Sequence, residues 1–263
     1  MYACMEKQSV LDIGMNSLVT IITPSYNSSR FVEECIDSVL AQTYRDWEMI
    51  IVDDCSTDDS AELIRDIITR EPRIKLIVLD ENVGAAEARN VALSMANGRF
   101  IAFLDSDDIW MSEKLERQLH FMQKNGYAFT FCAYIPISED GEDEYKSIWA
   151  PASIDYEGYL KNTIIGCLTV VIDREQTGDF RMPDVRSSHD MALWLEILNR
   201  GFRAYGIDEV LAKYRLVSSS NTAKKMSAVG DVWRVYRDIR GLPLAKSLYC
   251  WCHYLYHAVR KRL

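Results

Sequence analysis

Short apolar runs that alternate with amphipathic segments, between residues 18 and 104, constrain the fold of this chain more than any other feature. The apolar runs have the length and composition of buried strands, and they are LVTIIT (18–23), WEMIIV (47–52), RIKLIVL (73–79) and RFIAFL (99–104). The segments after them repeat apolar residues at helical spacing, and they are 29–42, 58–70, 84–96 and 113–125. Because strands that alternate with helices at this spacing build βαβ units, the pattern predicts an α/β fold with a doubly wound, mostly parallel sheet.

Local signals predict where several elements begin and end. Ser29 is in position to cap the first helix, Asn97-Gly98 to end the third, and Gly126 to end the fourth. Further along the chain we expect strands at 127–134, 168–172 and 209–216 and a short helix at 190–201. Residues 150–188 are otherwise less regular, so their structure is not predicted.

The 263 residues are enough for one large domain with an appendage, and 48% of them are hydrophobic, so the chain can bury a full core. We expect an N-terminal extension at 1–17, a main domain at 18–220 with halves at 18–110 and 111–220, and a helical C-terminal segment at 221–263. No run of about 18 apolar residues is present, so no transmembrane span is expected. The seven cysteines are scattered, which favours reduced thiols over a disulfide framework.

The net charge of −9 is unevenly distributed along the chain. From residue 222 onward nine Lys and Arg residues stand against two Asp residues, a charge of +7, so the preceding residues carry −16. The stretch LAKSLYCWCHYLYHAVRKRL (244–263) mixes aromatic, aliphatic and basic residues, which is typical of a helix at an anionic membrane surface. The alternative is a helix that packs on the domain and leaves a solvated basic end.

Polar residues follow the predicted strands at the points where the strands end. In an open parallel sheet, ligands bind beyond the carboxyl ends of the strands. The residues at these ends are Thr23, Pro24, Ser25, Tyr26 and Asn27, then Asp53 and Asp54, then Asn82 and Gly84, and finally Asp105, Ser106 and Asp107. We expect these four groups to converge on one ligand site.

Four stretches in this order resemble the nucleotide-sugar half of family 2 glycosyltransferases: VTIITPSYNSSRFVEECIDSVLAQTY, IIVDDCSTDDS, NVGAAEARNVAL and FIAFLDSDDIW. The resemblance covers roughly residues 18–217 and is nearest to the bacterial enzymes that build teichuronic acid, capsule or O-antigen repeats. It implies the GT-A fold, with a nucleotide-sugar half at 18–110 and an acceptor half at 111–220. It also implies a metal-dependent, inverting hexosyltransferase that uses a UDP-sugar.

The resemblance implies a set of residues that bind the nucleotide-sugar, namely Thr23, Pro24, Ser25, Tyr26, Asn27, Asp54, Gly84, Arg89, Asp105, Ser106 and Asp107. Tyr26 would pack on the uracil ring, and Asp54 would accept a hydrogen bond from the uracil N–H. Asp53 could instead be structural and accept from the loop amides that follow it. Arg89 would lie near the nucleotide or the donor sugar, or would form an ion pair at the edge of the core.

The resemblance also implies a divalent cation, Mn²⁺ or Mg²⁺, held by Asp107 and more loosely by Asp105. A diphosphate needs positive charge nearby, this part of the chain is acidic, and both ions prefer oxygen ligands. The metal would stabilise the charge that develops on the departing UDP. The alternative is that these carboxylates cap the following helix, a role that we expect of Asp108 and Ser112.

The stretch SSHDMALWLEI (187–197) resembles the acidic motif of the family, in which the last acid is the general base. That acid is Asp190 here, and an inverting transfer needs one base to take the proton of the acceptor hydroxyl. His189 and Trp194 are expected at the acceptor, although Asp190 could be only an N-cap and Trp194 could fill the core. Arg215 could reach the diphosphate or form a structural ion pair. Val217 stands where the family often has a His, so a third metal or phosphate ligand is missing or is supplied elsewhere.

These expectations describe an enzyme of cell-surface polysaccharide biosynthesis that moves a hexose from a UDP-sugar to a glycan acceptor on a polyprenyl diphosphate. We expect it in the cytoplasm, peripheral on the inner face of the plasma membrane and bound there through its C-terminal segment. No nucleic-acid partner is expected, and a homodimer is left open. The rivals are a sugar nucleotidyltransferase, which would want a Gly-rich basic phosphate loop, and a non-catalytic scaffold, which would lack the base or the metal acids. A dehydrogenase is disfavoured because no G-x-G-x-x-G follows the first strand.

Overall fold

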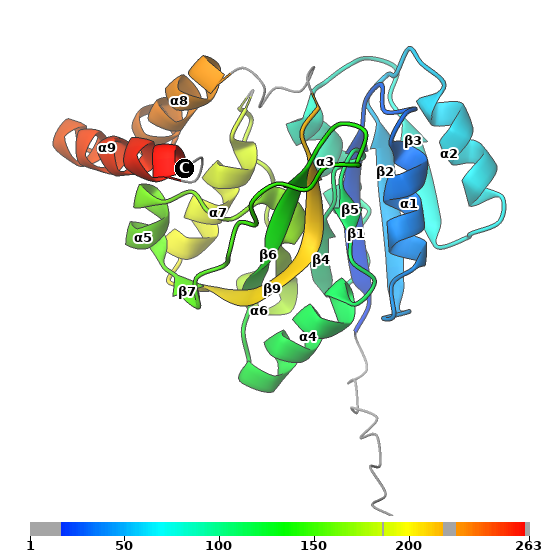
Figure 1. Ribbon diagram of the computed structural model, residues 1–263, viewed down its shortest axis with the longest axis horizontal. Helices are drawn as coiled ribbons and strands as arrows, with labels where there is room; N and C mark the ends of the chain where they lie inside the picture. The colour runs from blue at the N-terminus through cyan, green and yellow to red at the C-terminus, as the bar shows by residue number, and fades with distance from the viewer. Residues whose placement is uncertain (1–16, 186, 218–224, 261–263) are drawn as a thin grey trace, which may run out of the picture.

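The computed structural model of the protein describes residues 17–185, 187–217 and 225–260. One nine-stranded sheet runs through the molecule in the order β3-β2-β1-β4-β8-β6-β9-β5, and the short β7 pairs with β9 (Figure 1). The strands are β1 Val19–Ser25, β2 Trp47–Asp53, β3 Ile74–Val78, β4 Phe100–Phe103, β5 Ile109–Trp110, β6 Phe129–Ile137, β7 Ser153–Ile154, β8 Val171–Asp173 and β9 Ala204–Arg215.

The first four strands form the parallel half of the sheet, as the sequence predicts. β1 lies between β2 and β4, and it pairs in parallel with both. The chain therefore leaves β1 in one direction along the sheet and returns on its other side for β4. This reversal opens a crevice at the carboxyl ends of the two strands, where doubly wound folds bind ligands.

The second half of the sheet is mixed, because β8 runs antiparallel between β4 and β6. The strand predicted at 168–172 is wrong in its first half, where Cys167–Thr169 forms the 3₁₀-helix η1. The Thr169 hydroxyl donates to the Gly166 carbonyl, and Trp110 Nε1 donates to the Leu168 carbonyl. Because these bonds stabilise a turn, β8 begins only at Val171.

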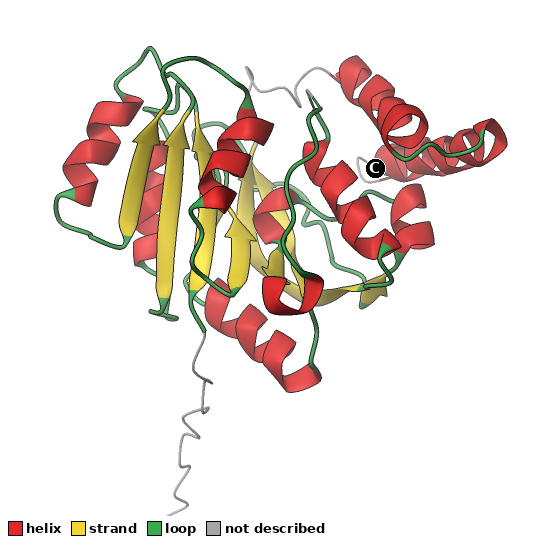
Figure 2. Cartoon of the chain, turned by 180° about the vertical axis from the view of Figure 1, so that it is seen from behind, coloured by secondary structure: helices red, strands yellow, loops and turns green. Residues whose placement is uncertain are grey.

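Helices cover both faces of the sheet and enclose two hydrophobic cores (Figure 2). Side chains of α1, α2 and α4 pack in one core, and those of α3 and α7 pack in the other. The helices are α1 Val32–Leu40, α2 Ser60–Ile68, α3 Ala85–Ser94, α4 Lys114–Asn125, α5 Tyr156–Lys161, α6 Arg174–Thr177, α7 His189–Asn199, α8 Lys225–Arg234, the π-helix η3 Val235–Ile239, and α9 Leu244–Arg260.

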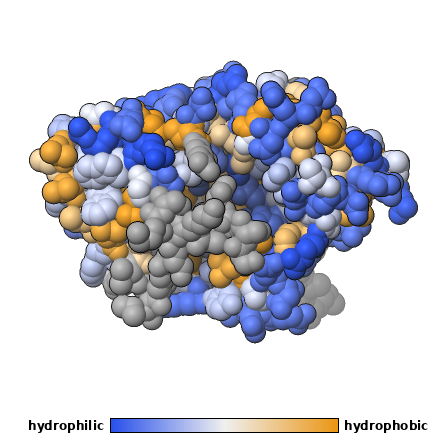
Figure 3. Space-filling model, turned by 90° about the horizontal axis from the view of Figure 1, so that it is seen from above, coloured by the Kyte–Doolittle hydropathy of each residue, from blue (hydrophilic) through white to orange (hydrophobic). Residues whose placement is uncertain are grey.

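The C-terminal helices pack on the domain beside α5 and α7, on the side away from α1 and α2 (Figure 1). Val235, Tyr236 and Cys250 are buried there, and the Tyr236 hydroxyl donates to the Leu160 carbonyl. Viewed from above, hydrophobic surface is visible at this end of the molecule (Figure 3). Among the described residues no helix combines the length and the apolar character needed to cross a bilayer.

Three predicted N-terminal caps are wrong. α1 begins at Val32 with Phe31 as its N-cap, and the Ser29 backbone N–H donates to Asp58 instead. Neither Asp108 nor Ser112 caps α4, whose N-cap is Glu113. Asp108 is followed by β5 and accepts from the Arg215 backbone N–H at 2.9 Å, because β5 pairs with β9 and brings these two residues together.

Gly98 does not end α3, which stops at Ser94, but permits a close approach between two segments of backbone. A Cβ at this position would lie 2.6 Å from both the Leu18 carbonyl oxygen and the Thr20 nitrogen. The Gly98 N–H donates to the Thr20 hydroxyl at 2.8 Å. A side chain here would therefore push β4 away from β1, the strand pair that frames the crevice.

We expect Gly98→Ala to lower the free energy of unfolding by about 1–3 kcal/mol, because the new methyl group meets backbone atoms that cannot move aside. Gly230→Ala on α8 is the matched control, since a Cβ there has no neighbour within 4 Å. That control should be neutral or stabilise by about 0.5–1 kcal/mol through helix propensity. Chemical denaturation measures both, and an equal effect of the two changes would contradict the close-approach role.

Candidate active site

A cavity of about 590 Å³ opens beyond the carboxyl ends of β4, β6 and β9. Its walls also include the first turn of α7, the segment between α5 and η1, and parts of α8 and α9. The predicted residues that line it are Arg89, Asp105, Asp107, His189 and Asp190. They come from three separate parts of the chain, which the fold brings together at this cavity.

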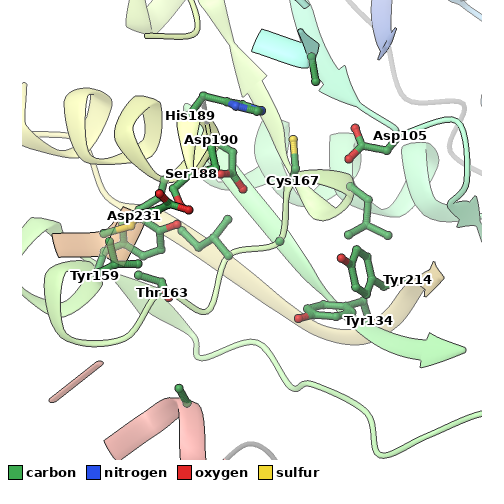
Figure 4. Close-up of a pocket in the computed structure, with 18 of the residues that line it drawn as sticks. Asp105, Tyr134, Tyr159, Thr163, Cys167, Ser188, His189, Asp190, Tyr214 and Asp231 are labelled. Carbon is green, nitrogen blue, oxygen red and sulfur yellow. The ribbon is translucent and has the colours of Figure 1, made fainter. Parts of the chain in front are cut away.

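The lining residues form two groups at opposite ends of the cavity (Figure 4). Asp105, Tyr134 and Tyr214 lie at one end, which we call the β4 end. His189, Asp190, Ser188, Tyr159, Thr163 and Asp231 lie at the other, which we call the α7 end. Cys167 lies between the two groups.

Arg89 joins the two ends of the cavity. It is 4% exposed, and its guanidinium donates to the Asp105 carboxylate and, at 2.6 Å, to Nε2 of His189. Burial acts to lower the pKa of Arg89, but the charge of Asp105 raises it above the ordinary value. Because a guanidinium can only donate, Nε2 of His189 must accept, so the ring is neutral. Burial and the charge of Arg89 also lower the pKa of His189, which agrees with this state.

A second buried arginine, Arg215 at the end of β9, holds the loop 105–108 from the other side. Its Nε donates to the Asp107 carbonyl at 2.9 Å, and its Nη1 donates to the Glu139 carbonyl at 3.0 Å. Its Nη2 pairs with the Glu34 carboxylate. All three nitrogens of the side chain are thus engaged, so the structural role is the one that the geometry supports.

Asp107 lines the cavity with a carboxylate that the described residues leave without a side-chain hydrogen bond. Burial, and then the negative charge of Asp105, raise the pKa of Asp107 to about 6. The same two causes, with the charge of Asp107, raise the pKa of the fully buried Asp108 well above its ordinary value. Positive charge is therefore in short supply around Asp107, despite the two arginines.

The described residues contain no cluster of three or more His, Cys, Asp or Glu side chains that could enclose a metal ion. Asp105 and Asp107 nevertheless fit a Mg²⁺ or Mn²⁺ ion. They offer hard oxygen ligands in a cavity where Asp107 lacks a cationic neighbour of its own. Such ions commonly bind through one or two carboxylates and complete their coordination with water and substrate phosphates.

Asp190 lies in the first turn of α7 and lines the α7 end of the cavity. It is not the N-cap, because that position is Ser188, whose backbone is left-handed with φ 58° and ψ 27°. Such a conformation is uncommon outside glycine and often occurs at functional sites. It turns the chain into α7, so that His189 and Asp190 both face the cavity. Burial, and then the charge of Asp190, raise the pKa of Tyr159 well above its ordinary value.

The residues predicted at the ends of β1, β2 and β3 are tied to one another beside the cavity. Asp54 is buried, and its two carboxylate oxygens accept from the backbone N–H groups of Val83 and Gly84, at 2.7 and 2.9 Å. Asn27 accepts from the Thr57 N–H at 2.8 Å, and Tyr26 is 51% exposed.

Asp53 accepts from the Ser56 N–H at 2.9 Å, which is the structural role left open for it. Of the residues predicted at the four strand ends, only Asp105 and Asp107 line the cavity. Those at the ends of β1, β2 and β3, Thr23, Pro24 and Ser25 among them, do not line it, and neither does Ser106.

Trp194 does not take part in the site, and its prediction as an acceptor-binding residue is wrong. It is fully buried on the inner side of α7, where its ring contacts Phe103 and Phe129 at centroid distances of 5.4 and 5.3 Å. Asp190 and Trp194 are four residues apart and share a face of α7. They differ in position along the helix, because the turn with Asp190 borders the cavity and the next turn, with Trp194, lies against β4 and β6.

Sequence reasoning did not find several lining residues, among them Tyr134, Tyr159, Asn162, Thr163, Asp231 and His257. Tyr159, Asn162 and Thr163 lie in the region 150–188, whose pattern predicts little. Asp231 and His257 belong to helices that the sequence assigns to an appendage, and only their packing reveals that they reach the cavity. No sequence signal marks them.

Comparison with known proteins agrees with this geometry. The model of the family named "Glycosyl transferase family 2" matches residues 20–179. TuaG of Bacillus subtilis (strain 168), whose name gives it a provisional role as a teichuronic acid biosynthesis glycosyltransferase, is 50% identical over 246 residues, 94% of this chain and 98% of its own length. WfgD of Escherichia coli, named as a UDP-Glc:α-D-GlcNAc-diphosphoundecaprenol β-1,3-glucosyltransferase, is 42% identical over 88% of this chain and 90% of its own length.

Two solved structures share the fold. Staphylococcus aureus TarS (1–349), in complex with UDP-GlcNAc, superposes with a TM-score of 0.72 at 20% identity, over 91% of this chain and 71% of TarS. The mannosyltransferase PcManGT of Pyrobaculum calidifontis, in complex with GDP-Man and Mn²⁺, gives a TM-score of 0.66 at 19% identity, over 92% and 75% of the two chains. The predicted GT-A fold is thus confirmed, and the chain belongs to glycosyl transferase family 2.

Proposed function

We propose that this protein transfers a hexose from a UDP-sugar to a glycan that is carried on a polyprenyl diphosphate, in the assembly of a cell-surface polysaccharide. The observation that carries the proposal is a single cavity with the carboxylates of Asp105 and Asp107 at its β4 end and that of Asp190 at its α7 end. The names of the relatives support it, since WfgD uses UDP-Glc with a diphosphoundecaprenol-linked acceptor.

The β4 end suits the donor. Asp105 and Asp107 would hold Mg²⁺ or Mn²⁺, which would neutralise the diphosphate and the charge that develops on the leaving UDP. Tyr26, half exposed after β1, offers a ring face for the uracil. Asp54 fixes the Val83 and Gly84 amides, and each of its oxygens retains a lone pair that can accept from the uracil N–H.

The α7 end suits the acceptor, with Asp190 as general base. The acceptor hydroxyl oxygen bonds to the anomeric carbon while the bond from that carbon to the diphosphate breaks, and its electron pair leaves with UDP. Asp190 takes the hydroxyl proton as the new bond forms. One displacement inverts the anomeric configuration and requires no enzyme nucleophile. Arg89 is a positioning residue, because it holds Asp105 and His189, the neighbour of Asp190, at a fixed separation.

The outer side of α9 suits a membrane surface. Leu248, Tyr249, Cys252 and Tyr256 are exposed there, opposite the side that packs on α5 and α8. Exposed or half-exposed cations on α9 and the neighbouring elements are Lys161, Arg234, Arg237, Arg240 and Lys246. The basic residues 261 and 262 lie outside the described part of the chain. An apolar helix side next to cations is the arrangement that binds anionic bilayers.

Asp107→Asn should abolish the manganese-dependent part of UDP binding, because it removes a charged oxygen ligand while keeping the shape of the side chain. Isothermal titration with UDP, with Mn²⁺ or with EDTA, measures this. Asp37→Asn, on the exposed side of α1, is the matched control and should bind UDP like the wild type. Unchanged UDP affinity of Asp107→Asn in Mn²⁺ would refute the metal assignment.

Asp190→Asn should lower the transfer rate on the order of 100–10,000-fold, the range for loss of a general base. Donor binding should persist, because the base acts on the acceptor hydroxyl. Steady-state transfer and UDP-sugar titration together test both statements. Asp184→Asn, an exposed acid just before α7, controls for the loss of charge, and a near-normal rate of Asp190→Asn would exclude its role.

Leu248→Gln combined with Tyr256→Gln should weaken binding to vesicles of phosphatidylglycerol by roughly tenfold or more, since each side chain contributes about 1.5–3 kcal/mol when fully buried. Tyr145→Gln, an exposed aromatic of the β6–β7 segment, is the control. Vesicle co-sedimentation gives the affinities, and circular dichroism verifies the fold. Equal binding by the double variant and the wild type would contradict a role of α9 at the bilayer.

A further inference from the structure

The C-terminal helices close the α7 end of the cavity, although they lie beyond the segment that the family model matches. Asp231 and Val232 of α8, and Tyr254, His257 and Ala258 of α9, are part of the lining. The inner side of α9 thus faces the cavity while its outer side is exposed. A segment that the sequence assigns to an appendage is therefore one wall of the site.

Asp231 is the acidic residue of this wall. Its side chain is 14% exposed, and it pairs with Arg234 one turn later on α8, with Arg234 Nη1 3.1 Å from Oδ1. Arg234 is itself 57% exposed, so the partner lies toward solvent, and Oδ2 of Asp231 is not used by this pair. Figure 4 shows Asp231 on the same side of the cavity as Ser188, Asp190 and Tyr159.

We infer that Asp231 accepts hydrogen bonds from hydroxyl groups of the acceptor sugar and so helps to select that sugar, an inference that rests on the proposed function. A carboxylate accepts strongly from hydroxyl donors, and it repels a phosphate. The polar neighbours at this end, Asn162, Thr163 and Ser187, also suit a neutral polyhydroxylated ligand. The acceptor sugar therefore lies with its hydroxyls toward α8 and with its diphosphate directed away from Asp231.

Asp231 is a specificity-determining residue and not a second base. Asp190 directly follows His189, which Arg89 binds together with Asp105, so Asp190 is the carboxylate of this end that is linked to the β4 end. Asp231 lies at the same end of the cavity but on α8, a different element, and it pairs with Arg234. The hydroxyl that receives the hexose faces Asp190, and other hydroxyls of the same ring face Asp231.

The test uses the full chain with a UDP-hexose, Mn²⁺ and short-chain lipid diphosphates that carry GlcNAc, GalNAc or glucose. Asp231→Ala should raise the acceptor KM about tenfold or more, the typical effect of losing a hydrogen bond to a charged group. The donor KM and the slow hydrolysis of the UDP-sugar without acceptor should not change. Asp238→Ala, an exposed acid of η3 on the same segment, is the matched control.

Acceptors that each lack one hydroxyl, other than the hydroxyl that receives the hexose, make the test specific. For the wild type, removal of a hydroxyl bound by Asp231 should raise the acceptor KM, and in Asp231→Ala this penalty should disappear. If the loss of the hydroxyl raises the acceptor KM by the same factor in Asp231→Ala as in the wild type, the inference is overturned. If Asp231→Ala does not fold, Asp231→Asn serves in the same comparison, with a smaller expected effect because its amide oxygen still accepts.

The proposed acceptor class and the role of Asp231 can be tested separately. If the wild type binds the UDP-sugar but uses none of the lipid diphosphates, the proposed acceptor class is wrong and the inference falls with it. If the wild type transfers and Asp231→Ala keeps the wild-type acceptor KM, the inference alone is wrong.

Discussion

Two buried guanidinium groups determine how much negative charge the loop 105–108 can carry. Three carboxylates in four positions would repel one another strongly in a low-dielectric interior. Arg89 forms an ion pair with Asp105. Arg215 donates from its side chain to the Asp107 carbonyl and from its backbone N–H to the Asp108 carboxylate. What remains is a partial imbalance centred on Asp107, whose raised pKa reports it. A site with this imbalance gains most from positive charge, which a divalent metal ion would bring.

The same contacts tie the two ends of the cavity together mechanically. Arg89 comes from α3, Asp105 from the end of β4, and His189 from the start of α7, so one side chain links three elements. The sheet adds a second link, because β4, β8 and β6 are consecutive neighbours across the two halves of the chain. The groups proposed to bind donor and acceptor are thus joined through packed strands and helices, which favours a defined distance between reacting atoms.

The sequence predicts features that depend on local periodicity, and it misses those that depend on long-range packing. The parallel order of β1 to β4 and the polar groups at their ends follow from alternating apolar runs and from the geometry of doubly wound sheets. The burial of Trp194 depends on its contacts with Phe103 and Phe129, which are distant in sequence. The hydrogen bond of Asp108 to the Arg215 backbone likewise depends on a long-range contact, the pairing of β5 with β9. The place of Asp231 in the cavity follows only from how α8 and α9 pack, since neither charge nor spacing distinguishes it from Asp238.

The two-sided character of α9 sets a length scale. A helix with its side chains is about 10–12 Å across. If the outer side of α9 rests on the bilayer as proposed, the cavity on its inner side lies about one helix diameter above the lipid headgroups. A sugar joined to the lipid through a diphosphate reaches this height, whereas the far end of a long glycan extends well beyond it. The thickness of a single helix would then restrict the enzyme to acceptors with a short glycan. No residue that recognises the length of the glycan would be required.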